Sequence, residues 1–130
     1  TDPSVPKEEI TTSLSSKDIE FLEKLTAIME REISNPDLSV DTLVEYFNFS
    51  RTIFFRKLKS LTGKSPITYI KDIRMKKAAQ LLREKEFNVA ETAYKTGFSD
   101  PHYFSKSFKQ YYGVSPTEYQ ENNKQAHKSS

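Results

Sequence analysis

Cysteine is absent from the 130 residues, which excludes disulfide bonds and metal sites built on thiolates. The two histidines, His102 and His127, are too few and too poorly placed to suggest a metal site, and we expect no cofactor. No run approaches the roughly 18 apolar residues of a transmembrane helix, and no signal-peptide pattern opens the chain. We therefore expect a cytoplasmic domain that makes no membrane contact.

Glycine is also scarce, with only Gly63, Gly97 and Gly113 present. The apolar residues recur mostly at helical spacing, so the sequence predicts an all-α fold of about seven helices. The sequence has no glycine-rich phosphate loop, no cluster of metal ligands and no nucleophile beside a base. We therefore do not expect an enzyme.

Acidic residues are unevenly distributed. Residues 1–37 hold four basic and nine acidic side chains, a net charge of −5, whereas residues 38–130 hold 16 basic and nine acidic ones, a net charge of +7. Basic charge concentrated in one part of a chain is typical of a protein that binds a polyanion. An ordinary solvated surface would also carry such a moderate excess, so charge favours nucleic acid without deciding it.

Residues 50–62, SRTIFFRKLKSLT, have the pattern of an amphipathic cationic helix. Phe54, Leu58 and Leu61 form an apolar stripe at helical spacing, four other residues are basic and none is acidic. Ser50 suits the start of a helix and Gly63 its end. Such a helix fits the major groove of DNA, although any amphipathic surface helix would show the same pattern.

The neighbouring segments place this helix in a helix-turn-helix pattern. A short helix over 40–47, capped by Ser39, precedes a turn at Asn48, and Phe49 is expected to fill the bend. After Gly63, a helix of roughly 19 residues runs from Pro66 to about 84 and spans about 28 Å. Apolar residues lie on more than one side of this long helix, so we expect it to lie between two packed units.

The pattern then repeats, with offsets of 49 and 50 residues. The first set of equivalent pairs is Val40/Val89, Leu43/Thr92, Val44/Ala93, Phe47/Thr96 and Phe49/Phe98, and the second is Phe54/Phe104, Arg56/Lys106, Leu58/Phe108, Lys59/Lys109, Gly63/Gly113, Ser65/Ser115, Pro66/Pro116 and Tyr69/Tyr119. The second unit should contain a helix over 89–96, a turn at Gly97 and a helix over 100–112, with Phe104, Phe108 and Tyr111 inward. A last helix begins at Pro116 and is expected to end near 122.

These patterns divide the chain into four parts. We predict a flexible linker over 1–15, a first helix-turn-helix subdomain with the linker helix over 16–84, a second over 85–122, and a disordered tail over 123–130. The first subdomain opens with an acidic helix capped by Ser16, whose apolar face holds Ile19, Leu22, Leu25, Met29 and Ile33. The chain starts with Thr1 rather than methionine, so we expect it to be part of a longer protein.

The repeat favours DNA binding. A purely structural duplication would repeat the core, but it would not need to repeat the outer cationic pair Arg56 and Lys59 as Lys106 and Lys109. Two recognition helices that enter successive major grooves on one face of DNA need a separation of about 34 Å, which the linker helix nearly provides. A helical protein-interaction module without DNA binding is the alternative.

The segments FSRTIFFRKLKSLTGKSPITYIKDIRMKKAAQLL (49–82) and NVAETAYKTGFSDPHYFSKSFKQYYGVSPTEY (88–119) resemble the DNA-binding domain of the AraC/XylS family of bacterial transcription regulators. The resemblance covers about residues 18–122. It implies two homeodomain-like helix-turn-helix units joined by a long helix, double-stranded DNA and RNA polymerase as partners, and dimerisation through parts missing from this chain. The first half also resembles the output end of hybrid two-component regulators.

The resemblance assigns base-reading positions to both recognition helices: Thr52, Phe55 and Arg56 in the first, and Pro101, His102, Tyr103, Ser105 and Lys106 in the second. Arg56 is the strongest candidate, because a guanidinium can bridge O6 and N7 of guanine. Phe55 departs from the polar residue often found there, and either a thymine methyl or simple packing would explain it. Pro101 has no side-chain donor and is expected to serve the helix start.

The remaining polar residues of these helices are assigned to phosphates or to the fold. Phosphate contacts are predicted for Ser50, Arg51, Lys57, Lys59 and Lys109, which set affinity without specifying sequence. Tyr69 and Tyr119 are expected to pack with satisfied hydroxyls. Arg74 is expected to be a structural ion-pair partner in the linker helix rather than a DNA contact.

Overall fold

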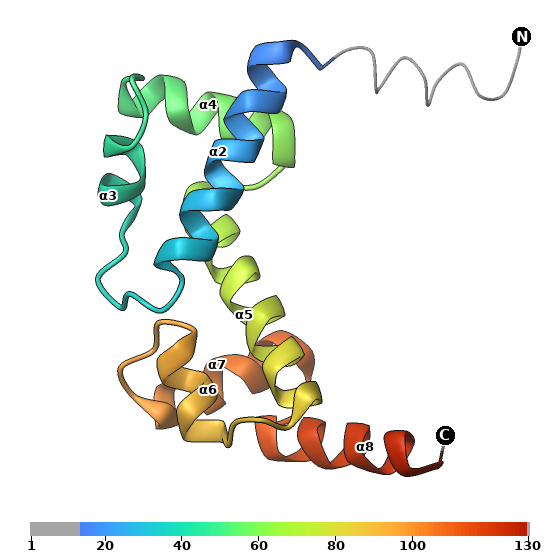
Figure 1. The fold of residues 1–130 in the computed structure, drawn as a ribbon. Coiled ribbons are helices and arrows are strands. Elements are labelled where there is room, and N and C mark those ends of the chain that lie inside the picture. Colours follow the sequence, from blue (N-terminus) through green and yellow to red (C-terminus); the bar gives the residue numbers. More distant parts are fainter. Residues whose placement is uncertain (1–13, 130) are drawn as a thin grey trace, which may run out of the picture. The chain divides into compact units, whose positions relative to one another are not determined.

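The computed structural model describes residues 14–129, with side chains described for 14–123 (Figure 1). It divides into two units, one ending at Arg31 and one covering Glu32–Ser130. Both helix-turn-helix segments belong to the second unit. Most of the predicted linker over 1–15, namely residues 1–13, lies outside the described residues.

Helix α2 (Ser16–Glu32) is the element of the first unit. Its cap is Ser15 rather than the predicted Ser16: the Asp18 backbone N–H donates to Ser15 Oγ at 3.1 Å, and the Ser15 N–H donates to Asp18 Oδ2 at 3.3 Å. The buried stripe is Phe21, Leu25, Ile28 and Met29, whereas the predicted Ile19 is 46% exposed. The apolar face is therefore rotated from the predicted one.

The first helix-turn-helix segment consists of α3 (Val40–Glu45) and α4 (Arg51–Thr62). The hydroxyl of Ser50 accepts the Ile53 N–H at 3.2 Å, and Gly63 ends α4 with a φ of 76°. Phe54 and Leu58 are fully buried, as predicted. α4 is therefore fixed by its caps and by one apolar face.

Helix α5 (Pro66–Glu84) is the predicted linker helix and has buried residues on more than one side. The exception lies in its first turn, where the predicted apolar residue Ile67 is 72% exposed. The helix ends at Lys85, whose φ of 61° is the only positive value of a non-glycine residue among those described.

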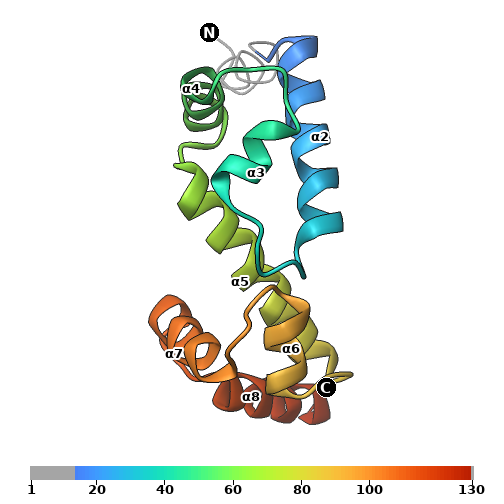
Figure 2. The same ribbon diagram turned by 90° about the vertical axis from the view of Figure 1, so that its left-hand side faces the viewer.

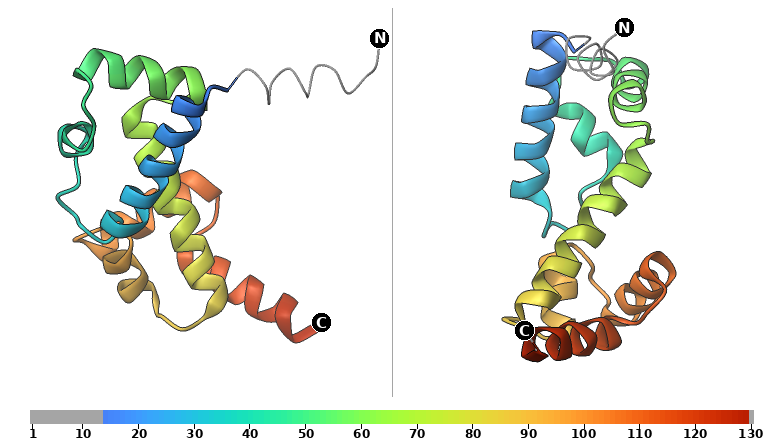
Figure 3. Two further views of the ribbon diagram at one scale, coloured as in Figure 1. Left: turned by 45° about the horizontal axis from the view of Figure 1, so that its top comes forward. Right: turned by 90° about the vertical axis from the view of Figure 1, so that its right-hand side faces the viewer.

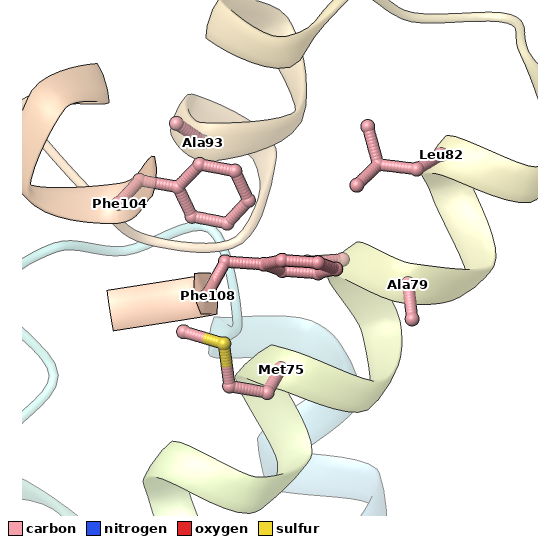
Figure 4. Close-up of a cluster of buried hydrophobic side chains, with 7 residues drawn as sticks. Met75, Ala79, Leu82, Ala93, Phe104 and Phe108 are labelled. Atoms are coloured by element: carbon pink, nitrogen blue, oxygen red, sulfur yellow. The ribbon is translucent and has the colours of Figure 1, made fainter. Parts of the chain in front are cut away.

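The second segment consists of α6 (Val89–Lys95) and α7 (Pro101–Tyr112) and packs on the second half of α5. Figure 4 shows the ring of Phe104 directed at Ala93 and the ring of Phe108 directed at α5, next to Met75. The prediction that Tyr111 belongs to this core is wrong, because Tyr112 packs against it while Tyr111 is 36% exposed. In the last turn of α7, Tyr112 rather than Tyr111 therefore lies on the buried face.

Helix α8 (Pro116–Ser129) follows and is longer than predicted, because it continues past the expected end near 122. It covers the end of α5: the Gln120 side-chain amide donates to the carbonyls of Leu82 and Phe87 at 3.3 and 3.2 Å. Arg83 Nη1 donates to the Tyr119 hydroxyl at 2.7 Å, so the predicted satisfied hydroxyl of Tyr119 is confirmed. All seven elements found in residues 14–129 are helices, which confirms the predicted all-α fold.

The two helices predicted to read DNA lie on the same side of α5. Figure 2 views both α4 and α7 nearly along their axes on one side of α5, and the right-hand view of Figure 3 shows the same from behind. Their axes therefore run in similar directions. Within the described residues, no helix is both long enough and apolar enough to cross a membrane.

Candidate nucleic-acid interface

The outer face of α4 carries the predicted base-reading side chains. Thr52 and Arg56 are both exposed, one turn apart on the same helix face. Phe55 is only half-buried: the centre of its ring lies 6.5 Å from that of Phe54, and the guanidinium of Arg51 lies over the Phe55 ring, 4.8 Å from its centre. Phe55 thus packs within α4, while Thr52 and Arg56 point to solvent.

The basic residues beside this face already have contacts within the chain. Arg51 forms an ion pair with Asp41 of α3, which ties the two helices of the motif together. Lys59 Nζ donates to the Gly63 carbonyl at 3.1 Å, and Lys57 Nζ lies 5.9 Å from the centre of the Phe49 ring. These cations can approach a phosphate only by sharing or exchanging such contacts.

Helix α7 presents an equivalent face. Its N-cap Asp100 accepts the His102 N–H at 3.0 Å, and Pro101 occupies the first helical position as predicted. The predicted contact residues of the face are exposed or, for Ser105 alone, half-buried: His102, Tyr103, Ser105, Lys106 and Lys109. With the offset of 50 residues, Thr52 and Arg56 of α4 correspond to His102 and Lys106 of α7.

One further residue of the interface is missing from the sequence-based predictions. Ile53 is 43% exposed, and it occupies the position in α4 that Tyr103, 62% exposed, occupies in α7. An exposed aliphatic residue on a recognition helix can contact the methyl group of thymine. The 50-residue offset was the signal that could have identified Ile53, since its equivalent was already a candidate.

Neither helix offers metal chemistry. Among the residues that the structure describes, no group of three or more histidine, cysteine, aspartate or glutamate side chains could hold a metal ion. The exposed groups of both faces are hydrogen-bond donors, cations and apolar side chains. Such groups read base edges and hold phosphates.

Two capped helices of 12 residues each, with equivalent exposed faces on one side of a shared helix, define a bipartite helix-turn-helix domain. The sequence profile of a family described as "Helix-turn-helix domain" matches residues 43–122. The chain belongs to this family, in its AraC-type branch of DNA-binding transcription regulators.

Similarity to individual proteins supports this assignment. Histidine kinase P4 of Formosa agariphila is 38% identical over 112 residues, which are 86% of this chain and 8% of that protein. The C-terminal domain of AraT, a response regulator from Geobacillus stearothermophilus, has a TM-score of 0.72 and 33% identity and covers 84% of this chain and 87% of its own.

A second similar structure contains DNA. The DNA-binding domain of the global transcriptional factor AdpA, solved in complex with a target DNA, has a TM-score of 0.71 and 29% identity over 78% of this chain and 90% of its own. The chain spans only between 8% and 33% of the length of the curated relatives it matches. The similarity therefore concerns one domain of those longer proteins.

Proposed function

We propose that this chain binds double-stranded DNA in a sequence-specific manner to regulate transcription, with α4 and α7 entering successive major grooves. The observation that carries the proposal is the equivalence of the two exposed faces, Thr52 and Arg56 on α4 and His102 and Lys106 on α7. Both helices lie on one side of α5 with similar axis directions, as two helices bound to one face of a duplex must.

The individual residues have distinct roles in this proposal. Arg56 donates two hydrogen bonds to a guanine, and Lys106 reaches guanine or phosphate as a less directional charge. Thr52, His102 and Ser105 donate to or accept from base edges, and Ile53 and Tyr103 add apolar contact. The remaining candidates are proposed to hold phosphates: Ser50, Arg51, Lys57, Lys59 and Lys109.

Phe55 has a smaller role in the proposal. Its ring contacts both Phe54 and the Arg51 guanidinium, which leaves only part of it for a thymine methyl. We propose that it mainly supports Arg51, whose charge remains near the phosphate backbone while it pairs with Asp41.

The wider context is also a proposal. Similarity to a histidine kinase and to the C-terminal domain of a response regulator supports an output module of a larger bacterial signalling regulator. Such a module would act in the cytoplasm, contact RNA polymerase and dimerise through other parts of its protein. The proposal gives the domain a binding role and no catalytic one.

Selection of bound duplexes from a random pool tests the proposal directly. We expect one motif with two conserved blocks whose centres lie about one helical turn apart, and an affinity that falls with salt with a logarithmic slope of roughly −5 to −8, as expected for six to nine phosphate contacts. Failure to enrich any sequence would contradict the proposal. Binding to a protein partner but to no duplex would instead favour an interaction module.

A further inference from the structure

Asp72 of the linker helix connects the ends of the two recognition helices. Its Oδ1 accepts a hydrogen bond from the Tyr111 hydroxyl at 2.8 Å, and its Oδ2 pairs with Lys64 Nζ. Tyr111 lies in the last turn of α7, and Lys64 directly follows the Gly63 cap of α4. Asp72 itself is only 8% exposed, so this carboxylate is held away from water by the groups that it joins.

Arg74, two residues further along α5, makes a second connection. Its Nη1 donates to the Gly97 carbonyl at 3.1 Å, and its Nη2 donates to the Asn35 carbonyl at 2.9 Å. Asn35 lies in the turn before α3, and Gly97 lies in the turn between α6 and α7. Arg74 thus bonds to the backbone of the turn that leads into the first helix-turn-helix segment and of the turn within the second, not to an acidic residue as the sequence predicted.

The backbone around Arg74 is tightly fitted. A Cβ atom on Gly97 would lie 2.6 Å from the Ile33 carbonyl oxygen and 2.7 Å from Arg74 Cζ. Real Cβ atoms do not approach other atoms so closely, so only glycine allows the two turns to meet there. The contact between the turn that precedes α3 and the turn between α6 and α7 therefore involves the backbone as well as the Arg74 side chain.

Apolar packing is incomplete beside these polar contacts. A pocket of about 600 Å³ is bordered by Ile67 and Ile70 of α5, by Arg74, and by Phe98 and Tyr103 of the second segment. Apolar contacts are not directional and leave room for rotation, whereas hydrogen bonds fix both distance and angle. The hydrogen bonds of Arg74, which borders this pocket, and those of Asp72 are therefore the interactions best suited to fix the orientation of the segments.

We propose that Asp72 and Arg74 are positioning residues that set the relative orientation of α4 and α7 and thereby the spacing of DNA half-sites that the chain accepts. This inference rests on the proposed two-groove binding. Neither residue needs to touch DNA for the role. It predicts that the two residues govern spacing rather than the sequence read by each helix.

The test uses variants that remove single bonds. Tyr111→Phe deletes only the hydroxyl that binds Asp72, and Arg74→Lys keeps the charge but replaces the two Nη donors of the planar guanidinium by a single nitrogen on a shorter side chain, which cannot occupy both donor positions. Tyr94→Phe, which deletes a hydroxyl from a 53% exposed tyrosine of α6, is the matched control. Each protein is titrated with the selected duplex, with duplexes whose second half-site is moved by one or two base pairs, and with a single half-site.

We expect the unchanged chain and the Tyr94→Phe control to prefer one spacing sharply. In Tyr111→Phe and Arg74→Lys, affinity for the single half-site should be retained, while the preference for the best spacing should fall by roughly three- to tenfold, the size expected for the net loss of one typical hydrogen bond. Asp72→Asn, which removes the charge that pairs with Lys64, should behave in the same way.

Other outcomes separate this inference from the proposed function. If the unchanged chain binds no specific duplex, or binds one without a spacing preference, two-groove binding itself is refuted. If the unchanged chain prefers one spacing and Tyr111→Phe and Arg74→Lys keep that preference, the positioning role is refuted. Equal weakening on all duplexes, single half-sites included, would also refute it by showing a general loss of structure. Should Arg74→Lys not fold by circular dichroism, Tyr111→Phe decides, because it removes one oxygen atom from a partly exposed side chain.

Discussion

Arg56 and Arg51 differ in position and partners, which is the basis for proposing base reading for Arg56 and phosphate contact for Arg51. The side chain of Arg56 is exposed on the face shared with Thr52, whereas Arg51 at the start of α4 pairs with Asp41. We expect Arg56→Ala to weaken binding to the selected duplex by about 1–3 kcal/mol and to relax the preference at one base pair. Competition titrations with duplexes changed at each position measure both effects.

Two further variants serve as controls for Arg56→Ala. Lys109→Ala should weaken binding to all sequences alike, as expected of a phosphate contact. Lys17→Ala removes an exposed cation from the acidic helix α2 and should leave DNA affinity nearly unchanged. If Arg56→Ala also weakened binding uniformly, Arg56 would be a phosphate contact as well.

Gly97 is the glycine that the fold can least replace. All three glycines have a positive φ, but only the Cβ of a residue at 97 would meet other atoms, whereas at 63 and 113 nothing lies within 4 Å. Gly63→Ala and Gly113→Ala should therefore lose about 1 kcal/mol of unfolding free energy through backbone strain alone. Gly97→Ala should lose about 2–4 kcal/mol, because steric overlap adds to the strain. Urea unfolding of the three variants tests this order, and equal losses would contradict it.

Thr92 of α6 and Thr96, the C-cap of the same helix, are two buried threonines that differ in whether the hydroxyl has a hydrogen-bond partner. Both Thr92 and Thr96 are fully buried; the Thr96 hydroxyl donates to the Thr92 carbonyl at 2.8 Å, whereas the Thr92 hydroxyl has no partner among the described residues. Thr92→Val should raise the unfolding free energy by about 1 kcal/mol, because it removes an unsatisfied polar group. Thr96→Val should lower it by about 1 kcal/mol. Thermal unfolding compares the two, and destabilisation by both would show that the Thr92 hydroxyl is satisfied.

Residue-level predictions succeeded where one helix determines the outcome. Phe54, Leu58, Phe104 and Phe108 follow from periodicity, because helical spacing alone places them on the buried face. The failure at Tyr111 has a physical cause: its hydroxyl binds Asp72, 39 residues earlier in the chain. Helical periodicity carries no information about a partner at that separation.

At the scale of elements, capping residues made the starts of most helices predictable. Ser39, Ser50 and Ser65 cap α3, α4 and α5 as side-chain acceptors, and Asn88 and Glu91 form a reciprocal capping box at α6. The helix ends were less predictable. α3 stops at Glu45, earlier than expected, and α8 continues beyond 122, since neither end is marked by glycine or proline.

The contact between Asp72 of α5 and Tyr111 of α7 should stabilise the fold only within a defined pH range. Burial raises the pKa of Asp72, but hydrogen bonds from Lys64 and Tyr111 and the charges of Lys64 and Lys76 outweigh it, so this pKa lies below its usual 3.8. Desolvation, followed by the hydrogen bond to Asp72, raises the pKa of Tyr111 from 10.0 to about 12. The stabilisation is thus complete between about pH 4 and 10; it is lost on the acid side as Asp72 is protonated and on the alkaline side as Tyr111 ionises.

This range predicts two pH profiles. The difference in unfolding free energy between the unchanged chain and Asp72→Asn should be constant near neutral pH and shrink as pH falls below 3.8. The difference between the unchanged chain and Tyr111→Phe should shrink between pH 10 and about 12. Urea unfolding across pH measures both. A difference that stays constant from neutral pH to either limit would show that the corresponding group makes no pH-dependent contribution.

For the whole molecule, the internal repeat made the order of the helices predictable but not the relative orientation of the two helix-turn-helix segments. The 50-residue offset identified both recognition helices and the long helix between them, and the structure confirms this all-α organisation. The offset could not reveal how the two segments are oriented, because orientation depends on Arg74 bonding to carbonyls 39 and 23 residues away in the sequence. The offset does pair Ile53 with Tyr103, but the 43% exposure of Ile53 depends on how the neighbouring helices pack.

If α4 and α7 are held in a fixed relative orientation, the spacing of the half-sites on DNA should be restricted. Moving the second half-site by about half a turn, roughly 5 base pairs, places it on the opposite face of the duplex, so affinity should fall to that of one half-site. Moving it by a full turn, about 10 base pairs, returns it to the same face but increases the separation of the half-sites by about 34 Å. This increase exceeds the roughly 28 Å length of α5, the helix that joins the two segments, whose 19 residues rise about 1.5 Å each. Affinity should therefore stay low at both shifts. Fluorescence anisotropy with a single-half-site duplex as reference measures this, and recovery at the full turn would show that the two segments move independently.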